Sequence, residues 1–348
     1  MSSLSNSSLM LVFGAAAIVT WIAGVALAKA TDVLDDRLQL GEAIGGMILL
    51  SVAGSLPELA ITLSAARSGH LDIAAGNLIG GIAMQTFVLV IADWFGRGRT
   101  PLSTAAASLV PALEGLLVIA VVCTTVMGGL LPASASIGPV GVATIGIVVI
   151  WITGMLLLNR VRNRPELALA AVDEKGSESI PPEGGAASDQ KQSTRRTILL
   201  FAIASIVTLF AGVMLEQSGN TLADNFGING VLFGATFLAF ATALPEISSG
   251  ITGVRLHRYT LVFGDMFGGN AFQLTLFLLA DLVAGQPVLP YEGKANAWIG
   301  TIGLIMTVIF VVGIVLRPQR RYARLGPDSW VVAIIYVLGL WGLVIVSQ

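Results

Sequence analysis

Two short stretches of this chain place a proline and a glutamate side by side within long apolar runs. They read Ser55-Leu56-Pro57-Glu58 and Ala243-Leu244-Pro245-Glu246. A proline inside a helix removes a backbone donor, so the carbonyl four residues earlier loses its helical partner; these carbonyls belong to Ala53 and Ala241. A glutamate in an apolar run is costly unless a cation or a polar group pairs with it. Two such turns therefore predict a site for cations.

The composition indicates a membrane protein. Of the 348 residues, 55% are hydrophobic and 11% are charged, whereas soluble domains carry about a quarter charged residues. The 19 basic and 21 acidic residues nearly balance, which argues against a nucleic-acid partner. With one cysteine, Cys123, no intrachain disulfide can form. The sequence contains no Cys/His cluster with metal-binding spacing, no His-Glu-x-x-His motif and no Ser/Lys dyad, so we expect neither a bound cofactor nor an enzymatic activity.

Ten apolar segments approach the length of about 20 residues that a membrane-spanning helix needs. The first lacks the positive N-terminal charge of a signal peptide and is kept as a helix. The first five segments are Leu9–Ala28, Leu40–Ala66, Ile73–Phe95, Ser103–Met127 and Ile137–Leu158. The second five are Thr197–Glu216, Ile228–Val254, Thr260–Ala284, Ala295–Leu316 and Trp330–Val346. The chain thus divides into a membrane unit 1–158, a polar linker 159–196 that we expect to be mostly disordered, and a second membrane unit 197–348.

The distribution of lysine and arginine predicts the orientation. All but two of these residues, Arg67 and Lys294, fall in the loops after segments 1, 3, 5, 7 and 9. Because cytoplasmic loops carry the excess of positive charge, this side should be cytoplasmic. We therefore expect a multi-pass protein of the plasma membrane (the cell inner membrane), with both termini outside and the linker in the cytoplasm.

The two halves are related by an internal repeat. Shifting the chain along itself until Glu58 coincides with Glu246 gives 14 identities over positions 46–93 without a gap. Each unit has five segments, an odd number, so the second unit must enter the membrane from the opposite side. The expected fold is an all-α membrane protein with ten helices in two inverted five-helix repeats, in which the two Pro-Glu turns approach each other near the middle of the bilayer.

Two glutamates facing each other carry a charge of −2, which a divalent cation, two monovalent cations or protons neutralise. Calcium takes about six to eight oxygen ligands. We expect these from carboxylates, hydroxyls, amide oxygens and the carbonyls freed by the prolines. The candidates are Glu58, Glu246, Ser55, Thr242, Gln85, Gln273, Ala53 and Ala241.

A glycine-rich stretch follows each Pro-Glu turn and brings further groups into range. The two stretches, 76–81 and 264–269, allow one helix to approach another closely. Positions 265, 269 and 273 share one helix face, so Asp265 should also face the site.

At these residues the chain resembles the cation/calcium antiporter superfamily, of which the sodium/calcium exchangers are members. That family carries two inverted repeats, each with a Gly-Thr-Ser-Leu-Pro-Glu-like turn and a Gly-Asn-x-x-Gly-Ser-Asn-x-x-Asn-like helix. The resemblance covers both halves and the linker between them. It implies secondary active antiport of calcium against sodium, with ligand roles for Glu58, Ser55, Glu246 and Thr242. It also implies that segments 1 and 6 slide or rock against a core of segments 2, 3, 7 and 8.

The chain departs from the family pattern at several positions: Gly54 and Ala243 lack the expected hydroxyls, Asp265 replaces an asparagine, and four further departures lie in the second core helices. Glycines, Gly81 and Gly269, stand where the family has serine, and glutamines, Gln85 and Gln273, stand where it has asparagine or aspartate. The reduced oxygen count favours cation/proton antiport as the alternative. A non-transporting membrane protein that senses ions, or has a structural role, with a degenerate site is the alternative from another class. The expected partners are inorganic cations and the lipid bilayer, and no pattern specifies an oligomeric state.

Overall fold

The structure, a computed structural model, describes residues 4–38, 52, 54–96, 100–162, 194–228, 230–291 and 293–347. Most of these residues are helical. The first half contains α1 (Asn6–Leu38), α3 (Leu56–Ser68), α4 (Leu71–Phe95), α5 (Leu102–Ala105), α6 (Leu109–Gly129), β1 (Ser136–Ile137), β2 (Val140–Gly141) and α7 (Val142–Arg162). The second half contains α9 (Thr194–Phe226), α10 (Gly230–Phe233), η2 (Gly234–Leu238), α11 (Ala239–Thr242), α12 (Leu244–Arg255), α13 (Tyr259–Gln273), η3 (Leu274–Leu276), α14 (Phe277–Ala284), η4 (Leu289–Tyr291), α15 (Gly293–Leu316) and α16 (Pro327–Val346).

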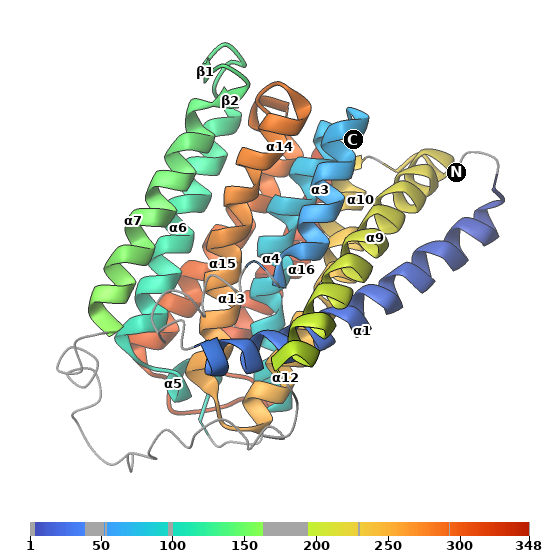
Figure 1. Ribbon diagram of the computed structural model, residues 1–348. Helices are drawn as coiled ribbons and strands as arrows, with labels where there is room; N and C mark the ends of the chain where they lie inside the picture. Colours follow the sequence, from blue (N-terminus) through green and yellow to red (C-terminus); the bar gives the residue numbers. More distant parts are fainter. Residues whose placement is uncertain are drawn as a thin grey trace.

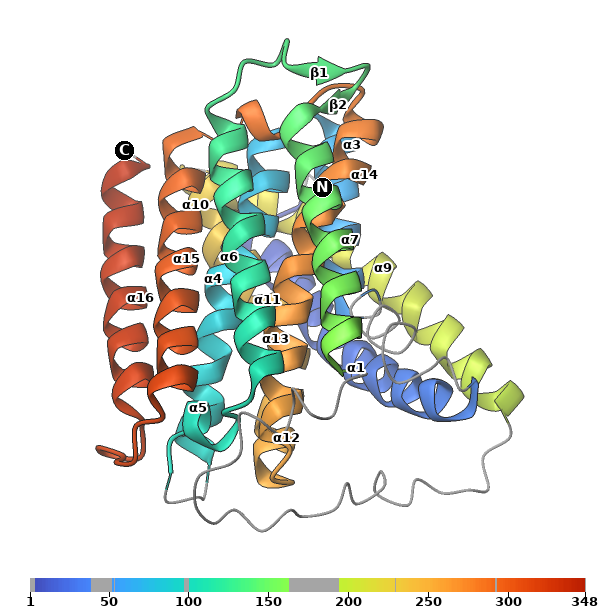
Figure 2. The same cartoon turned by 90° about the vertical axis from the view of Figure 1, so that its left-hand side faces the viewer.

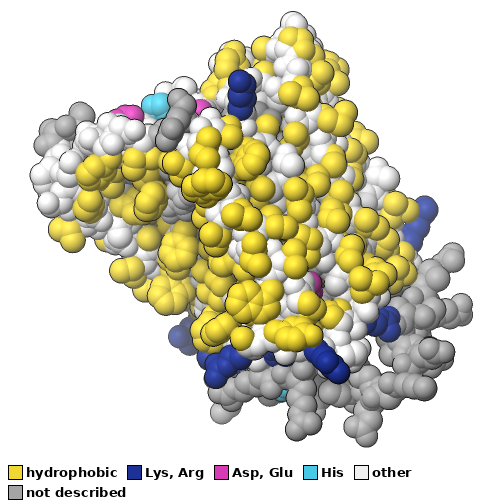
Figure 3. All heavy atoms as spheres, turned by 180° about the vertical axis from the view of Figure 1, so that it is seen from behind, with side chains coloured by type: hydrophobic (Ala, Val, Ile, Leu, Met, Phe, Trp, Pro, Cys, Tyr) yellow, Lys and Arg dark blue, Asp and Glu magenta, His cyan; other side chains and the backbone are white. Residues whose placement is uncertain are grey.

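The all-α membrane fold is confirmed. Within the described residues, eight helices are long and apolar enough to cross a membrane, and a bent pair, 234–242 with 244–255, makes a ninth. Of the remaining expected segment, Leu40–Ala66, residues 40–51 and 53 lie outside the described part. Apolar side chains cover the face seen in Figure 3, and Lys and Arg gather mainly along its lower rim. Most of the expected linker, residues 163–193, also lies outside the described part.

The helix α4 lies in the middle of the bundle (Figures 1 and 2). Nearly all of its side chains are buried, and it contacts α3, α12, α13, α15 and α16. The two long helices α1 and α9 pack against each other and run obliquely to the rest, and they contact α12 and α3 respectively. The start of α1 and the end of α16 lie toward the same end of the bundle (Figure 1).

Three predicted segments are interrupted in the structure. The fourth splits into α5 and α6, and the start of the fifth forms the hairpin of β1 and β2 instead of helix. The seventh passes through a π-helix, η2, and bends by 52° between Thr242 and Leu244. This bend has a local cause, because Pro245 cannot donate the next helical hydrogen bond.

The repeat extends to the backbone conformation of the turns between core helices. The α3–α4 turn contains Gly69 at φ 80°, in the left-handed region, and the α12–α13 turn contains His257 at φ 60°. The same shift that relates the two glutamates relates these two residues. Glycine adopts this conformation readily, whereas histidine adopts it only where the surroundings require it. The same turn is thus built twice with different residues.

A buried aspartate closes the end of α4. Asp93 Oδ2 accepts hydrogen bonds from the backbone N–H of Gly326 (2.7 Å) and the hydroxyl of Ser329 (2.8 Å), both at the start of α16. Its Oδ1 accepts the N–H of Leu102 (3.0 Å) and pairs with Arg321 at 3.1 Å. Asp93 therefore ties the first half of the chain to the second.

The repeat equivalent of Asp93 makes the reciprocal connection. Asp281, in α14, accepts hydrogen bonds from the N–H of Gly141 (3.0 Å) and the hydroxyl of Thr144 (2.8 Å) at the start of α7. It also accepts the N–H of Val288 at 2.7 Å. The structure shows both aspartates buried, where each one caps the start of a helix in the opposite half.

Replacing Asp93 with alanine should strongly destabilise the protein. The change leaves two backbone donors and the Arg321 guanidinium without their carboxylate, and losing one partner of a buried ion pair costs about 3–5 kcal/mol. We expect a markedly lower melting temperature in detergent. Asp72→Ala, at an exposed aspartate in the first turn of the same helix, should have little effect. Equal melting temperatures for the two variants would contradict the anchoring role of Asp93.

Candidate functional site

Both Pro-Glu turns begin a helix. Pro57 and Pro245 are the second residues of α3 and α12, and each glutamate follows in the first turn. Proline is well suited there because the first helical N–H groups have no partner within the helix. The prolines therefore start new helices instead of lying inside continuous spans.

The two glutamates are buried and close to each other. Glu58 is 0% exposed and Glu246 is 9% exposed, and the two carboxylates are near enough for their charges to interact. Among the described residues, no hydrogen-bond donor reaches either oxygen of Glu58 or Oε2 of Glu246. Isolated buried carboxylates are strongly unfavourable. The geometry therefore fits a group completed by a cation or by protons.

The residues just before α12 add oxygen atoms beside Glu58. The Thr242 side chain lies close to the Glu58 carboxylate, and its hydroxyl donates to the carbonyl of Ala239 at 3.2 Å. The preceding residue, Ala241, is also buried. Its carbonyl has no helical donor, because Pro245, four residues later, lacks an N–H. On the other turn Ser55 is buried, whereas Ala53 lies outside the described residues.

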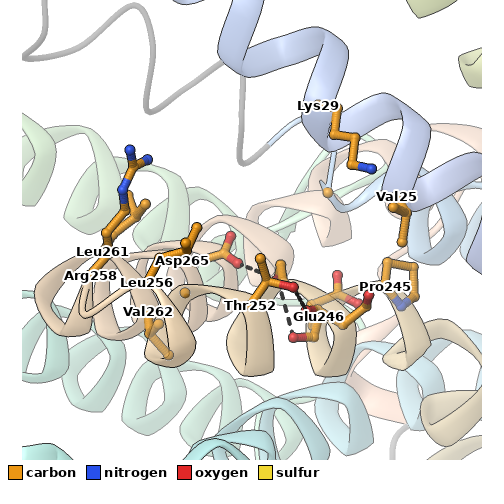
Figure 4. A pocket seen from close by; sticks show the side chains of 14 residues that line it. Val25, Lys29, Pro245, Glu246, Thr252, Leu256, Arg258, Leu261, Val262 and Asp265 are labelled. Atoms are coloured by element: carbon orange, nitrogen blue, oxygen red, sulfur yellow. Dashed lines mark hydrogen bonds between the residues drawn. The ribbon is translucent and has the colours of Figure 1, made fainter. Parts of the chain in front are cut away.

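A third carboxylate lies beside Glu246. Asp265, on α13, interacts electrostatically with Glu246 and accepts a hydrogen bond from the Ser249 hydroxyl at 3.0 Å. Figure 4 shows Asp265 and Glu246 on adjacent helices. The structure thus brings Asp265 to the glutamates, as the helix-face argument predicts. The contribution of Ser249 was not predicted, because this residue has no polar equivalent in the first repeat: its counterpart is Ile61.

Asn77 is a further polar group at the site that the sequence argument did not select. Its Nδ2 donates to the carbonyl of Glu58 (3.3 Å) and the hydroxyl of Thr62 (3.4 Å). Its buried Oδ1 has no donor among the described residues. A signal was available, because Asn77 is the repeat equivalent of Asp265.

The two glutamines, which were expected as cation ligands, are hydrogen-bonded to each other. The Gln85 Nε2 donates to Gln273 Oε1 at 2.9 Å, and the Gln273 Nε2 donates to the carbonyl of Leu78 at 2.8 Å. Their amides bind each other and the backbone, so they bridge α4 and α13. Neither of these two hydrogen bonds involves a glutamate.

Glu114, a buried carboxylate of α6 without an acidic repeat equivalent, lies against α13. A side chain at Gly264 would contact the Glu114 carboxylate at 3.4 Å. Glu114 therefore lies next to the segment that carries Asp265.

A cavity of about 190 Å³ reaches the site from one end of the bundle. It lies between α1, which contributes Val25 and Lys29, and the pair α12 and α13, which contributes Glu246 and Asp265 (Figure 4). The turn between α12 and α13 also borders it, so the cavity extends from Glu246 toward the end of the bundle where that turn lies. Glu58 is fully buried and does not line this cavity.

The site is not a ready-made metal centre. Over the described part of the chain, no three His, Cys, Asp or Glu side chains are gathered tightly enough to hold an ion by themselves. A cation here would need hydroxyl, amide and carbonyl oxygens in addition to carboxylates. Such a mixed ligand set suits an ion that is bound and released.

Sequence comparisons place the chain among ion exchangers. The sequence model described as sodium/calcium exchanger protein matches residues 8–128 and 196–348. The inner membrane protein YrbG of Escherichia coli (strain K12) is 25% identical over 270 residues, which cover 78% of this chain and 76% of that protein. The putative antiporter CaxA of Alkalimonas amylolytica is 26% identical over 257 residues, which cover 73% of this chain and 72% of that protein.

Solved structures share the fold. The H+/Ca2+ exchanger CAX is similar with a TM-score of 0.61 at 13% identity, covering 97% of this chain and 88% of that one. The sodium-calcium exchanger NCX_Mj is similar with a TM-score of 0.58 at 15% identity, covering 96% of this chain and 98% of that one. At these identities the likeness concerns the arrangement of helices alone.

Proposed function

The chain belongs to the sodium/calcium exchanger protein family and is therefore a cation antiporter of a lipid bilayer, and we propose that it exchanges calcium for a monovalent cation at Glu58 and Glu246. The observation that carries the proposal is the pair of buried carboxylates, of whose four oxygens three have no donor among the described residues. Each glutamate comes from one repeat, so the site is shared by the two halves.

The charge of the pair explains obligatory exchange. Without a cation the two carboxylates carry −2 in a region of low polarity, and moving that charge between access states is costly. One calcium ion, two sodium ions or two protons cancel it. Asp265 and the oxygens of Thr242, Ser55 and Asn77 would complete the coordination of calcium, which prefers oxygen ligands in this number and variety. A loaded site can then change its access while an unloaded one cannot.

The helices α1 and α9 are placed to alternate the access. The helix α1 forms one wall of the cavity that reaches Glu246, and α9 packs on α3, which carries Glu58. A shift of this pair relative to the core would close the cavity on one side and open a path to Glu58 on the other.

Two counter-ions are compatible with this site. Sodium is the first candidate, because the hydroxyls of Ser55 and Thr242 and both glutamates are retained. Protons are the second candidate, and the specific observation in their favour is the Gln85–Gln273 hydrogen bond, which engages the amide oxygen of Gln273, one of the oxygens that sodium could use.

Calcium uptake into proteoliposomes tests the function directly. One set of vesicles carries an outward sodium gradient, a second carries an outward proton gradient, and a third carries neither. Uptake that depends on one of the gradients supports antiport and identifies the counter-ion. Uptake equal in all three sets, or in none of them, would contradict the proposal, and the second result would favour a non-transporting protein.

The orientation is part of the proposal. The α12–α13 turn, which borders the cavity, carries Arg255 and Arg258, and the excess of such residues marks the cytoplasmic side. Both termini would then be outside, the linker cytoplasmic, and the conformation described here open to the cytoplasm.

A cysteine in the cavity should react from the cytoplasmic side alone. Thr252 lines the cavity, so Thr252→Cys in a Cys123→Ser background should be labelled by an impermeant thiol reagent in inside-out vesicles, and calcium should slow the labelling. Gln286→Cys, at an exposed position beyond α14 at the other end of the bundle, should react in right-side-out cells instead. The reverse pattern would invert the proposed topology.

A further inference from the structure

Polar contacts join the oblique helix α9 to the C-terminal end of α3 and to the turn that follows it. The Glu216 carboxylate, 1% exposed, accepts a hydrogen bond from the Ser64 hydroxyl at 2.8 Å and lies 3.3 Å from Nδ1 of His70. One turn further along α9, Nδ2 of Asn220 lies 3.3 Å from Nε2 of His70. His70 directly precedes α4, so these contacts link a helix outside the core to the turn between two core helices.

The close packing of α9 on α3 brings the polar groups together. A Cβ on Gly212, one turn before Glu216, would lie 2.6 Å from Cβ of Ala60, which is one turn before Ser64. Residues four apart share a helix face, so the same two faces present Glu216 to Ser64. In Figure 1, α3 lies in the upper half of the bundle and α12 in the lower half. The two helices therefore stay in contact up to the end of the bundle opposite the cavity.

The end of the bundle with the cavity has no equivalent pair. The shift that relates the two repeats relates His70 to Arg258 and Glu216 to Ala28. An arginine and an alanine cannot form an ion pair. Arg258 instead lines the cavity, and Lys29 lines it from α1 (Figure 4). The repeat is thus closed at the end where the His–Glu contact exists and open at the end where it is replaced.

We propose that His70 and Glu216 form a latch that holds the outer end of the transporter closed, and that protons outside the cell strengthen it and so favour the conformation open to the cytoplasm. This inference rests on the proposed function and orientation and adds a control by external pH. Histidine is the side chain whose charge ordinarily changes between about pH 5 and 8. The protonated ring forms an ion pair with the carboxylate, whereas the neutral ring makes at most a weaker hydrogen bond. The ion pair is therefore present at low external pH and is lost as the pH rises.

External protons have access to one member of the pair only. The side chain of His70 is 40% exposed, whereas Glu216 is buried. The charged residues nearest in the chain are Arg67 at the end of α3, Asp72 at the start of α4 and Asp224 near the end of α9. All three are exposed, so water and salt screen their effect on the pair.

The helices packed around the latch bring no competing charge to it. The helix α1 packs on α9, and its first charged residue is Lys29, which lines the cavity at the other end. The helix α14 packs on α3, and its single charged residue, Asp281, accepts hydrogen bonds from the start of α7. In α4 the other charged residue, Asp93, lies at the opposite end of the helix. His70 is thus the group through which external pH acts on Glu216.

Labelling of the cavity tests the latch without relying on transport. Thr252→Cys in a Cys123→Ser background is labelled by an impermeant thiol reagent in inside-out vesicles, whose lumen corresponds to the outside of the cell. The bath pH stays constant, so the reactivity of the thiol does not change, and calcium is equal on both sides. The lumen is set to about pH 5.5 or about pH 8, at either side of the histidine range. The acidic lumen should speed the labelling by about threefold, as expected for a partly exposed ion pair.

Three variants in the same background separate charge from packing. His70→Gln and Glu216→Gln cannot form the ion pair, so each should label equally fast at both lumen pH values, and at the rate of the parent protein with the alkaline lumen. His70→Lys carries a fixed positive charge and should label at the fast rate at both values. Arg67→Gln is the matched control, because it removes a nearby exposed charge and should keep the threefold effect.

The outcomes for the latch and for the proposed function are distinct. Equal labelling of the parent protein at both lumen pH values would overturn the latch, and so would slow labelling of His70→Lys. A pH effect that persists in His70→Gln would also overturn it and would assign the effect to protons at the site glutamates. None of these results bears on calcium uptake driven by a sodium or proton gradient. Absence of that uptake would overturn the proposed function, whereas the labelling would still report the closure of the outer end.

Discussion

Replacing Glu58 with glutamine should lower calcium uptake by at least about 100-fold, which corresponds to about 2.7 kcal/mol of lost cation binding. The change removes one of the two negative charges while keeping the size and one oxygen of the side chain. A divalent cation is then no longer neutralised by the pair. Because Glu58 is fully enclosed, water cannot substitute for the lost carboxylate, so the loss should be at least as large as at Glu246, which borders the cavity.

The Glu58→Gln protein should remain folded. Neither oxygen of Glu58 accepts a hydrogen bond from the described residues, so a neutral side chain removes charge without breaking an internal bond. A thermal shift separates binding from folding. A ligand at about 100 times its dissociation constant stabilises the folded state by about 2.7 kcal/mol. Calcium should therefore raise the melting temperature of the wild type and leave that of the variant unchanged.

Glu216 provides a matched control. It is a buried glutamate of α9 outside the site, where it accepts a hydrogen bond from Ser64 at 2.8 Å and lies 3.3 Å from His70 Nδ1. Glutamine can still accept from Ser64, so Glu216→Gln should transport calcium almost as the wild type does. Retained transport in Glu58→Gln, or equal losses in both variants, would exclude a special role for the two site glutamates.

The sequence predicts those features of the site that depend on local pattern and on the repeat. Pro57 and Pro245 indicate a break in the helical hydrogen bonding because proline lacks an N–H. The offset between the two repeats pairs Glu58 with Glu246, and helical periodicity places Asp265 on the face toward them. The cost of exposing charged groups to lipid then predicts that these carboxylates are buried. These arguments need only neighbours in the chain or the equivalent position in the other half.

The features that the sequence did not predict depend on side-chain length and on contacts between distant helices. Gln85 and Gln273 were expected as cation ligands, and the hydrogen bond between them was not predicted: each amide is long enough to reach its counterpart, and Gly81 leaves the room to do so. The partners of Asp93 in α16 likewise come from the opposite half of the chain. Periodicity carries no information about such pairs. The break before Pro245 was foreseeable as a bend, whereas the π-helix η2 before it was not.

The crossing of α1 and α9 over the core should depend on two glycines. A Cβ on Gly24 of α1 would lie 2.5 Å from Cγ of Pro245, and a Cβ on Gly212 of α9 would lie 2.6 Å from Cβ of Ala60 and 3.1 Å from the carbonyl of Pro57. The two glycines are equivalent positions of the repeat, so each oblique helix contacts the Pro-Glu turn of the opposite repeat through the same position. These contacts couple the oblique helices to the site.

Gly24→Ala should therefore reduce calcium uptake by about tenfold, which equals about 1.4 kcal/mol and lies within the roughly 1–3 kcal/mol that overpacking costs. The proline ring is fixed to the backbone, so it cannot rotate away from the added methyl group. To relieve the clash, either α1 or the first turn of α12, which carries Glu246, must then shift. Gly212→Ala should act in the same way on the turn that carries Glu58.

Gly14→Ala on the same helix is the control. No described atom lies within 4 Å of a Cβ at that position, and alanine in a helix interior is favoured over glycine by about 0.5–1 kcal/mol. It should leave uptake unchanged and raise the melting temperature slightly, opposite in sign to Gly24→Ala. If Gly14→Ala and Gly24→Ala transport calcium equally well, the contact between α1 and Pro245 has no role in the transport cycle. A loss of calcium uptake in Gly24→Ala and Gly212→Ala, but not in Gly14→Ala, would show that the oblique helix of each repeat acts on the glutamate of the other repeat.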